Sequence, residues 1–132
     1  MRATAFADKY GITLDTEFLG EQANADGWEH HAYGVTLSYE QEGKTKSVTT
    51  SFRMGLALCR EPNLREVLTS LSEDMLYADY DAFSFMADLG YDNPDRAREV
   101  FGAVQSLKTK LSLWVRSAQM WEDFLSIAEE AY

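Results

Sequence analysis

The sequence predicts an α+β fold with a short N-terminal helix, a three-stranded antiparallel sheet and then a bundle of about four helices packed on that sheet. Between positions 12 and 54, apolar residues alternate with polar ones, as in strands with one buried face. From position 64 onward they recur every three or four residues, as in amphipathic helices. At 132 residues, 45% of them apolar, the chain is expected to form a single domain over 1–132, with a sheet part over about 1–58 and a helical part over about 62–132.

The N-terminal helix is expected over residues 4–10. Thr4 can cap its first turn, and Gly11 can adopt the left-handed conformation that ends many helices. Residues 20–27 are rich in Gly, Asn and Asp and are expected to form a loop. The first strand lies between these two stretches and has its less polar side on alternate residues, namely Ile12, Leu14, Thr16 and Phe18.

The other two strands are expected to form a hairpin. Residues 28–39 and 47–54 both alternate between apolar and polar, and residues 41–44 supply the turn between them. The face expected to be buried carries Tyr33, Val35, Leu37, Tyr39, Val48, Thr50, Phe52 and Met54.

Start signals divide the rest of the chain into four helices. Asn63 and Glu66 stand three residues apart, which is the spacing of a capping box. Asp81 can cap a short second helix. Asn93 is followed by a proline and predicts the start of a long third helix, and Ser117 can cap the last one.

These helices are each expected to bury one apolar face. Trp114 of the long helix and Trp121 of the last helix are expected in the core, because their spacing suits helix packing. The sequence leaves open whether Tyr132 lies in the core or on a partner-binding surface. The short helix should end at Gly90, and its buried residues are expected to be Phe83, Met86, Ala87 and Leu89.

The chain is strongly acidic, with 22 Asp and Glu against 12 Lys and Arg and a formal net charge of -10. Such a surface repels nucleic acid and anionic membranes and favours basic partners, although acidity also serves solubility. The acids are unevenly spread. Seven lie between Lys9 and Lys44, and eight lie between Arg65 and Arg96, in both cases without a basic residue among them.

Two interpretations of the second acidic block stay open. Several of its residues stand at helix starts, where a negative charge interacts favourably with the helix dipole. Alternatively, carboxylates about one helical turn apart can imitate the phosphates of duplex DNA and occupy a basic groove. On that hypothesis the partner-binding residues are Glu73, Asp74, Asp79, Asp81, Asp88, Asp92 and Asp95.

No catalytic or metal site is expected from the motifs. His30 and His31 are adjacent in a strand, so they point to opposite faces and cannot easily share one ion. Cys59 is the one cysteine, so no internal disulfide can form, as is usual in a reducing compartment. Residues 92–95 lack the glycine and distal glutamate of a calcium loop, and the sequence has no phosphate-binding loop, nucleophile elbow or membrane-spanning run. A cytoplasmic protein that is no enzyme and needs no cofactor is therefore predicted.

Three segments carry a further signal: residues 51–55 (SFRMG), 61–68 (EPNLREVL) and 85–97 (FMADLGYDNPDRA). They resemble a family of small proteins encoded by tailed phages and prophages, and the resemblance covers about residues 50–110. Members typically show a strand ending near Ser-Met-Gly, a helix start at Pro-Thr-Leu and a Gly-Tyr-Asp segment before a long helix. Asn63 replaces the usual threonine here. The resemblance implies a phage context and transfers no catalytic residue.

Small acidic phage proteins without enzyme motifs often resemble inhibitors of host defence, including anti-CRISPR proteins. The leading hypothesis is a phage-encoded inhibitor of a host nucleic-acid-binding defence complex. Its expected partner is a host protein with a basic groove, such as a CRISPR effector subunit, and neither nucleic acid nor a membrane is a direct partner. The alternative is a structural or regulatory phage protein that forms a homodimer or acts as an adaptor. A small hydrolase or nuclease is the third hypothesis.

Overall fold

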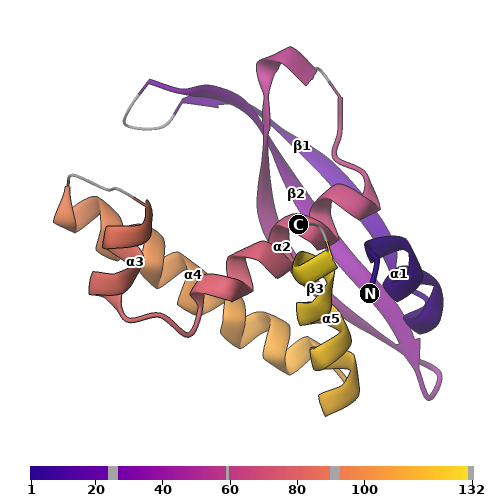
Figure 1. Cartoon of the computed structure of the whole chain (residues 1–132). Coiled ribbons are helices and arrows are strands. Elements are labelled where there is room, and N and C mark those ends of the chain that lie inside the picture. Colours follow the sequence, from indigo (N-terminus) through magenta and orange to yellow (C-terminus); the bar gives the residue numbers. More distant parts are fainter. Residues whose placement is uncertain (24–26, 59, 90–92, 131–132) are drawn as a thin grey trace. The chain divides into compact units, whose positions relative to one another are not determined.

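The computed structural model describes residues 1–23, 27–58, 60–89 and 93–130 and shows the α+β fold that the sequence predicts (Figure 1). Within these residues, one helix precedes three strands, and four helices follow them. A single 3-10 turn, η1, comes directly after the third strand. The bounds are α1 (Ala3–Tyr10), β1 (Thr13–Ala23), β2 (Glu29–Gln41), β3 (Lys44–Gly55), η1 (Leu56–Leu58), α2 (Leu64–Tyr77), α3 (Ala82–Leu89), α4 (Pro94–Trp114) and α5 (Ala118–Glu130).

The chain divides into two compact units. The sheet unit comprises Arg2–Leu68, and the helical unit comprises Met1 together with Thr69–Tyr132. The division falls inside α2, whose first residues belong to the sheet unit and whose last turns belong to the helical unit. That the whole chain forms one domain stays a prediction.

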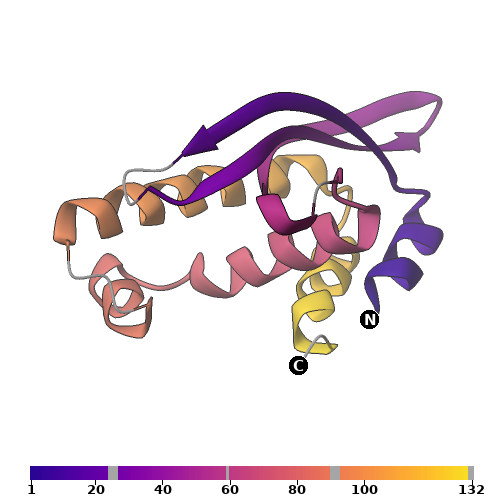
Figure 2. The ribbon, with the colours of Figure 1, turned by 90° about the horizontal axis from the view of Figure 1, so that it is seen from above.

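The sheet is antiparallel throughout, with the strand order β1-β2-β3, and Figure 2 shows it as one twisted layer. Gln41 pairs with Lys44, so the expected hairpin turn contains only two residues. These are Glu42 and Gly43, with φ of 52° and 77°. Two consecutive positive φ values are typical of the type I′ turn, whose twist matches that of the strands it joins.

β1 is longer than the sequence predicts. The expected loop over residues 20–27 is wrong in its first part, because Gly20–Ala23 continue the strand and pair with residues 29–32 of β2. The register shifts between Phe18 and Gly20, which marks a β-bulge, and Gly20 has a φ of 104° that favours glycine. Phe18 lies on the expected face, because it pairs with Tyr33 and its ring packs 5.4 Å from that of Tyr33, but 55% of it is exposed beside this bulge. Residues 24–26 of the expected loop lie outside the described part of the chain.

One face of the sheet is apolar, as the alternation predicts. The opposite face carries pairs of hydroxyls across β2 and β3: the Oγ1 atoms of Thr36 and Thr49 lie 2.9 Å apart, and the Oγ atoms of Ser38 and Ser47 lie 2.8 Å apart. Cross-strand partners share a face, so these pairs hold the register of the hairpin from its polar side. Thr50 and Phe52 on the apolar face are half-buried, and its buried residues are Tyr33, Val35, Leu37, Tyr39, Val48 and Met54.

The start signals of the four C-terminal helices are confirmed. Asn63 and Glu66 form the capping box, because each side chain accepts a hydrogen bond from the backbone N–H of the other, at 3.0 and 2.8 Å. Asp81 and Ser117 accept from the backbone N–H three residues on, and Asn93 accepts from the N–H of the first turn of α4. In α1 the expected cap is wrong, since the helix already begins at Ala3 and its N-cap residue bonds through no side chain.

The end of α1 is confirmed at Gly11, whose φ of 67° lies in the left-handed region. In the helical unit, Leu71 and Met75 of α2, Leu111 and Trp114 of α4, and Met120, Phe124, Ile127 and Ala128 of α5 are buried. Trp121 is half-buried. No helix in the described ranges combines the length and the apolar character that a bilayer crossing requires.

α3 presents a different face from the one expected. Its buried residue is Phe85, whose ring packs 5.3 Å from that of Phe101 in α4 and 5.9 Å from that of Tyr77 in α2. Residues two apart on a helix point about 200° apart, so burying Phe85 turns Phe83 outward, where 78% of it is exposed. Ala87 is also exposed, and Met86 is half-buried. The side chain of Leu89 and the expected stop at Gly90 lie outside the described residues.

Candidate binding surface

The structure places the candidate contact residues in three places of the helical unit. Glu73 and Asp74 lie on α2 and are half-buried. Asp95 is exposed in the first turn of α4. Asp92 lies outside the described residues. The remaining candidates, which are exposed and lie at the turn from α2 into α3 and on α3 itself, are Asp79, Asp81 and Asp88.

We call the exposed residues at the turn from α2 into α3 and on α3 the α2–α3 corner, and we define it as Asp79, Tyr80, Asp81, Phe83 and Asp88. The carboxylate of Asp81 accepts from the backbone N–H of Ser84 at 2.8 Å and from its hydroxyl at 3.3 Å. Asp81 and Asp88 are seven residues apart, about two helical turns, so they lie on the same side of α3. Figure 1 shows α3 beside the start of α4.

Asp88 is linked to Tyr80. A hydrogen bond to the Asp88 carboxylate, reinforced by its negative charge, raises the pKa of the Tyr80 hydroxyl. The Tyr80 ring meets that of Tyr77 edge to face, with centroids 5.4 Å apart. Contacts therefore hold both the hydroxyl and the ring of Tyr80, although 37% of the residue is exposed. Within the corner, Tyr80, Asp81 and Asp88 are thus already held by contacts within the unit.

The carboxylates of the corner differ in how far they are neutralised. Asp79 pairs with Lys108 of α4. Asp81 and Asp88 have no Lys or Arg partner among the described residues. Outside the corner, Asp95 pairs with Arg98 at 3.3 Å. No hydrogen bond or ion pair in the described ranges joins Glu73, Asp74 or Asp95 to the corner.

Asp74 differs from the other candidates in its surroundings. Burial, with a smaller contribution from the negative charge of Glu73, raises the pKa of Asp74 to about 6. A carboxylate that is costly to ionise contributes less to a negative surface than a solvated one. Of the candidate contact residues that the structure describes, Asp81 and Asp88 are therefore the exposed carboxylates without a basic partner.

The sequence did not identify Phe83 and Tyr80 as surface residues. α3 has two possible apolar stripes: one starts at Phe83, and the other runs through Ala82, Phe85 and Met86. Both have helical spacing, so periodicity alone does not choose between them. The only available signal was that Phe83 and Phe85 cannot both face inward from one short helix.

The histidines occupy opposite faces of β2, as expected for neighbours in a strand. His30 is 2% exposed, and its Nδ1 lies 3.4 Å from the carbonyl oxygen of Trp28. The ring of His31 is half-buried, with its Nε2 3.5 Å from a carboxylate oxygen of Glu21. In the part of the chain that the structure describes, no three metal-ligating side chains come together. Cys59 lies outside that part.

In comparisons with known protein families, curated proteins and solved structures, nothing matches this chain. Functional inference therefore depends on the geometry and charge of its own residues.

Proposed function

We propose that this chain is an acidic binding protein that docks its α2–α3 corner on the basic groove of a host nucleic-acid-binding defence complex, in the manner of an anti-CRISPR protein. The observation that carries the proposal is the exposure of Phe83, at 78%, on a short helix that Asp81 caps and that contains Asp88, two carboxylates without basic partners among the described residues. A large aromatic residue gains nothing from such exposure in the free protein. At an interface it is an effective anchor.

The carboxylates of the corner favour binding to a positively charged surface. Negative charge at the corner steers the chain toward a positive surface and accelerates association. Ser84 already orients Asp81, and Tyr80 already contacts Asp88, so less side-chain freedom is lost on docking. An exposed aromatic anchor and oriented carboxylates on different sides of one short helix fit a basic groove with an apolar wall, and occupation of this groove would exclude the nucleic acid that it serves.

The net charge supports the same partner class. At -10, the chain as a whole is repelled by phosphates and attracted by clustered Lys and Arg. A phage origin, which the resemblance of residues 50–110 implies, would put such a partner in the cytoplasm of a bacterial host. Inhibition by this route is stoichiometric and needs no chemistry from the chain, so we propose a binding protein and no enzyme.

The experiment is affinity capture of the host complex on the tagged full-length chain, followed by competition with the nucleic acid that the complex binds. We expect a nucleic-acid-binding complex to be recovered, and free nucleic acid to displace it. The variant Phe83→Ala with Asp88→Asn should recover little of it. The matched control is Glu122→Gln with Glu129→Gln, which removes exposed charges from α5 and should recover as much as the native chain.

Two results would contradict the proposal. One is recovery of a host complex that binds the corner variant as well as the native chain. The other is recovery of no host protein together with a concentration-dependent homodimer, which would favour a structural or regulatory role through self-association.

A further inference from the structure

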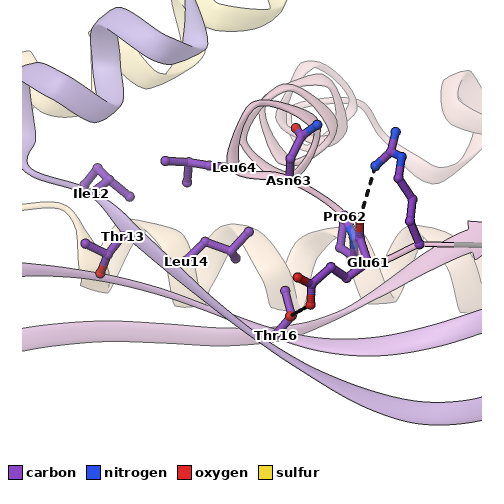
Figure 3. Close-up of a pocket in the computed structure, with 9 residues that line it drawn as sticks. Ile12, Thr13, Leu14, Thr16, Glu61, Pro62, Asn63 and Leu64 are labelled. Carbon is purple, nitrogen blue, oxygen red and sulfur yellow. Dashed lines mark hydrogen bonds between the residues drawn. The ribbon is translucent and has the colours of Figure 1, made fainter.

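A groove lies beside β1 in the sheet unit (Figure 3). Ile12 and Leu14 line it from the start of the strand, and Pro62 and Leu64 line it from the segment that enters α2. Its volume is about 840 Å³, large enough for several side chains of a bound peptide. All the residues that line it lie in the sheet unit, so it is separate from the α2–α3 corner.

The strand beside this groove is an edge strand. Among the described strands, β1 pairs only with β2, so its other edge has no strand beside it. An edge strand presents a row of backbone N–H and C=O groups, and extended peptides bind sheets by adding a strand to such an edge. In a strand added to β1, alternate side chains would enter the groove, and the others would lie on the opposite face of the sheet.

The charge on the opposite face of the sheet favours basic residues at the peptide positions whose side chains do not enter the groove. Asp15 and Glu17 alternate with Leu14 and Thr16, so they project from the face away from the groove. Both are exposed, and neither forms an ion pair in the described ranges. A residue added opposite either of them meets an uncompensated carboxylate, and cross-strand pairs of opposite charge are favourable.

The groove itself is also negative. The Glu61 carboxylate accepts a hydrogen bond from the Thr16 hydroxyl at 2.5 Å and forms no ion pair among the described residues, while the backbone carbonyl of Glu61 accepts from Arg60 at 3.2 Å. The one basic residue that lines the groove, Arg60, is neutralised by two hydrogen bonds to the Glu66 carboxylate, at 2.5 and 3.0 Å. This interaction lowers the pKa of Glu66. The groove therefore presents no uncompensated positive charge to a basic peptide.

A second copy of the chain does not fit this edge. Pairing β1 with another β1 would bring Asp15 and Glu17 close to the same acids of the other copy, and like charges across strands are destabilising. The partner must bring the opposite charge.

We propose that the free edge of β1 binds an extended peptide segment of another protein in which apolar and basic residues alternate. Its apolar side chains enter the groove between Leu14 and Leu64, and its Lys or Arg side chains face Asp15 and Glu17. This site goes beyond the proposed function and does not depend on it, because it uses a different unit of the chain.

The test uses a fluorescein-labelled peptide of four Val and four Lys in strict alternation, titrated with the full-length chain at low salt and followed by fluorescence anisotropy. The control peptide has the same composition with the four Val and the four Lys in separate blocks. We expect the alternating peptide to bind at least about tenfold more tightly, because only alternation separates the two sets of side chains between the two faces. Equal binding of the two peptides would overturn the proposal.

N-methylation of the peptide tests strand addition without changing the protein. Every second amide of an added strand points toward β1. Methylating one alternate set should weaken binding more than about tenfold, and methylating the other set should change it less than about twofold. Equal effects of both sets would show that no strand is added.

Variants of the chain then locate the site. Asp15→Asn with Glu17→Gln should weaken binding of the alternating peptide about fivefold at low salt, and Leu14→Thr should weaken it by a similar factor. Glu122→Gln with Glu129→Gln, the matched control, and Phe83→Ala at the corner should leave binding unchanged. Insensitivity to the β1 variants, or a homodimer that these variants abolish, would contradict the assignment.

Discussion

Ser72 places a hydroxyl in the interior of the helical unit, between α2 and α5. It donates to the carbonyl oxygen of Phe124 at 2.8 Å and accepts from the N–H of Ala128 at 3.0 Å, and the residue is fully buried. A buried hydroxyl with both functions satisfied stabilises the contact between the two helices. Ser72 is thereby bonded to two residues that lie 52 and 56 positions further along the sequence.

We expect Ser72→Ala to lower the free energy of unfolding by about 1–2 kcal/mol, because two buried hydrogen bonds are lost. Urea unfolding followed by circular dichroism measures the change. Ser106→Ala, at an exposed position of α4, is the control and should change the free energy by less than about 0.5 kcal/mol. A Ser72→Ala chain as stable as the native one would show that the hydroxyl contributes nothing.

Asp74 makes stability depend on pH. Its pKa is raised from 3.8 to about 6 in the folded chain, by burial and by Glu73. Between these two pH values the folded state keeps a proton that the unfolded state has released, so stability falls as pH rises through this window. The effect is at most about 3 kcal/mol and is reduced by the partial exposure of the side chain.

Asp74→Asn should therefore stabilise the chain at pH 7.5, and this gain should shrink as the pH is lowered toward 4. Unfolding free energies of both chains, measured at several pH values, give the comparison. The control is Asp15→Asn, which removes an exposed acid and should not reproduce the trend. A gain from Asp74→Asn that is the same at pH 4 and pH 7.5 would contradict the raised pKa.

Among the elements, the β2–β3 hairpin contains one residue with an unfavourable backbone conformation. Glu42 adopts a φ of 52°, where a side chain crowds the following carbonyl, at a cost of about 1–2 kcal/mol. Asn tolerates this conformation better. We expect Glu42→Asn to raise the free energy of unfolding by about 0.5–1 kcal/mol, as measured by thermal or urea unfolding. Glu17→Gln on β1 removes an equal charge at an exposed position outside the hairpin, so an equal gain from that control would assign the effect to charge.

Element starts were predictable where the signal is local. The capping box of Asn63 and Glu66 and the caps at Asp81, Asn93 and Ser117 act over two or three residues, so the sequence alone is enough to find them. The buried face of α3 was not predictable, because two apolar stripes compete and contact with Phe101 of α4 decides between them. The sequence underestimated the length of β1 for a similar reason, because the last residues of this strand are extended only through their pairing with β2.

At the scale of the whole molecule, the sequence gives the sum of the charges and their blocks, but not which charges stay uncompensated. Asp79 and Lys108 are 29 positions apart in the sequence, and only the fold pairs them. Asp95 and Arg98 are three apart on one helix, and their pair could have been foreseen. The candidate surface therefore narrows from a run of acids to the α2–α3 corner, where Asp81 and Asp88 have no basic partner among the described residues and Phe83 is exposed.

The most direct measurement for this corner is the dissociation constant of the captured host complex with the native chain and with Phe83→Ala, at low and at moderate salt. We expect Phe83→Ala to weaken binding about 30-fold at both salt concentrations, since an aromatic anchor contributes about 2 kcal/mol that salt does not screen. For the native chain, binding should weaken as salt rises, through Asp81 and Asp88. A Phe83→Ala chain that binds as tightly as the native chain, with no dependence on salt in either, would contradict docking through the α2–α3 corner.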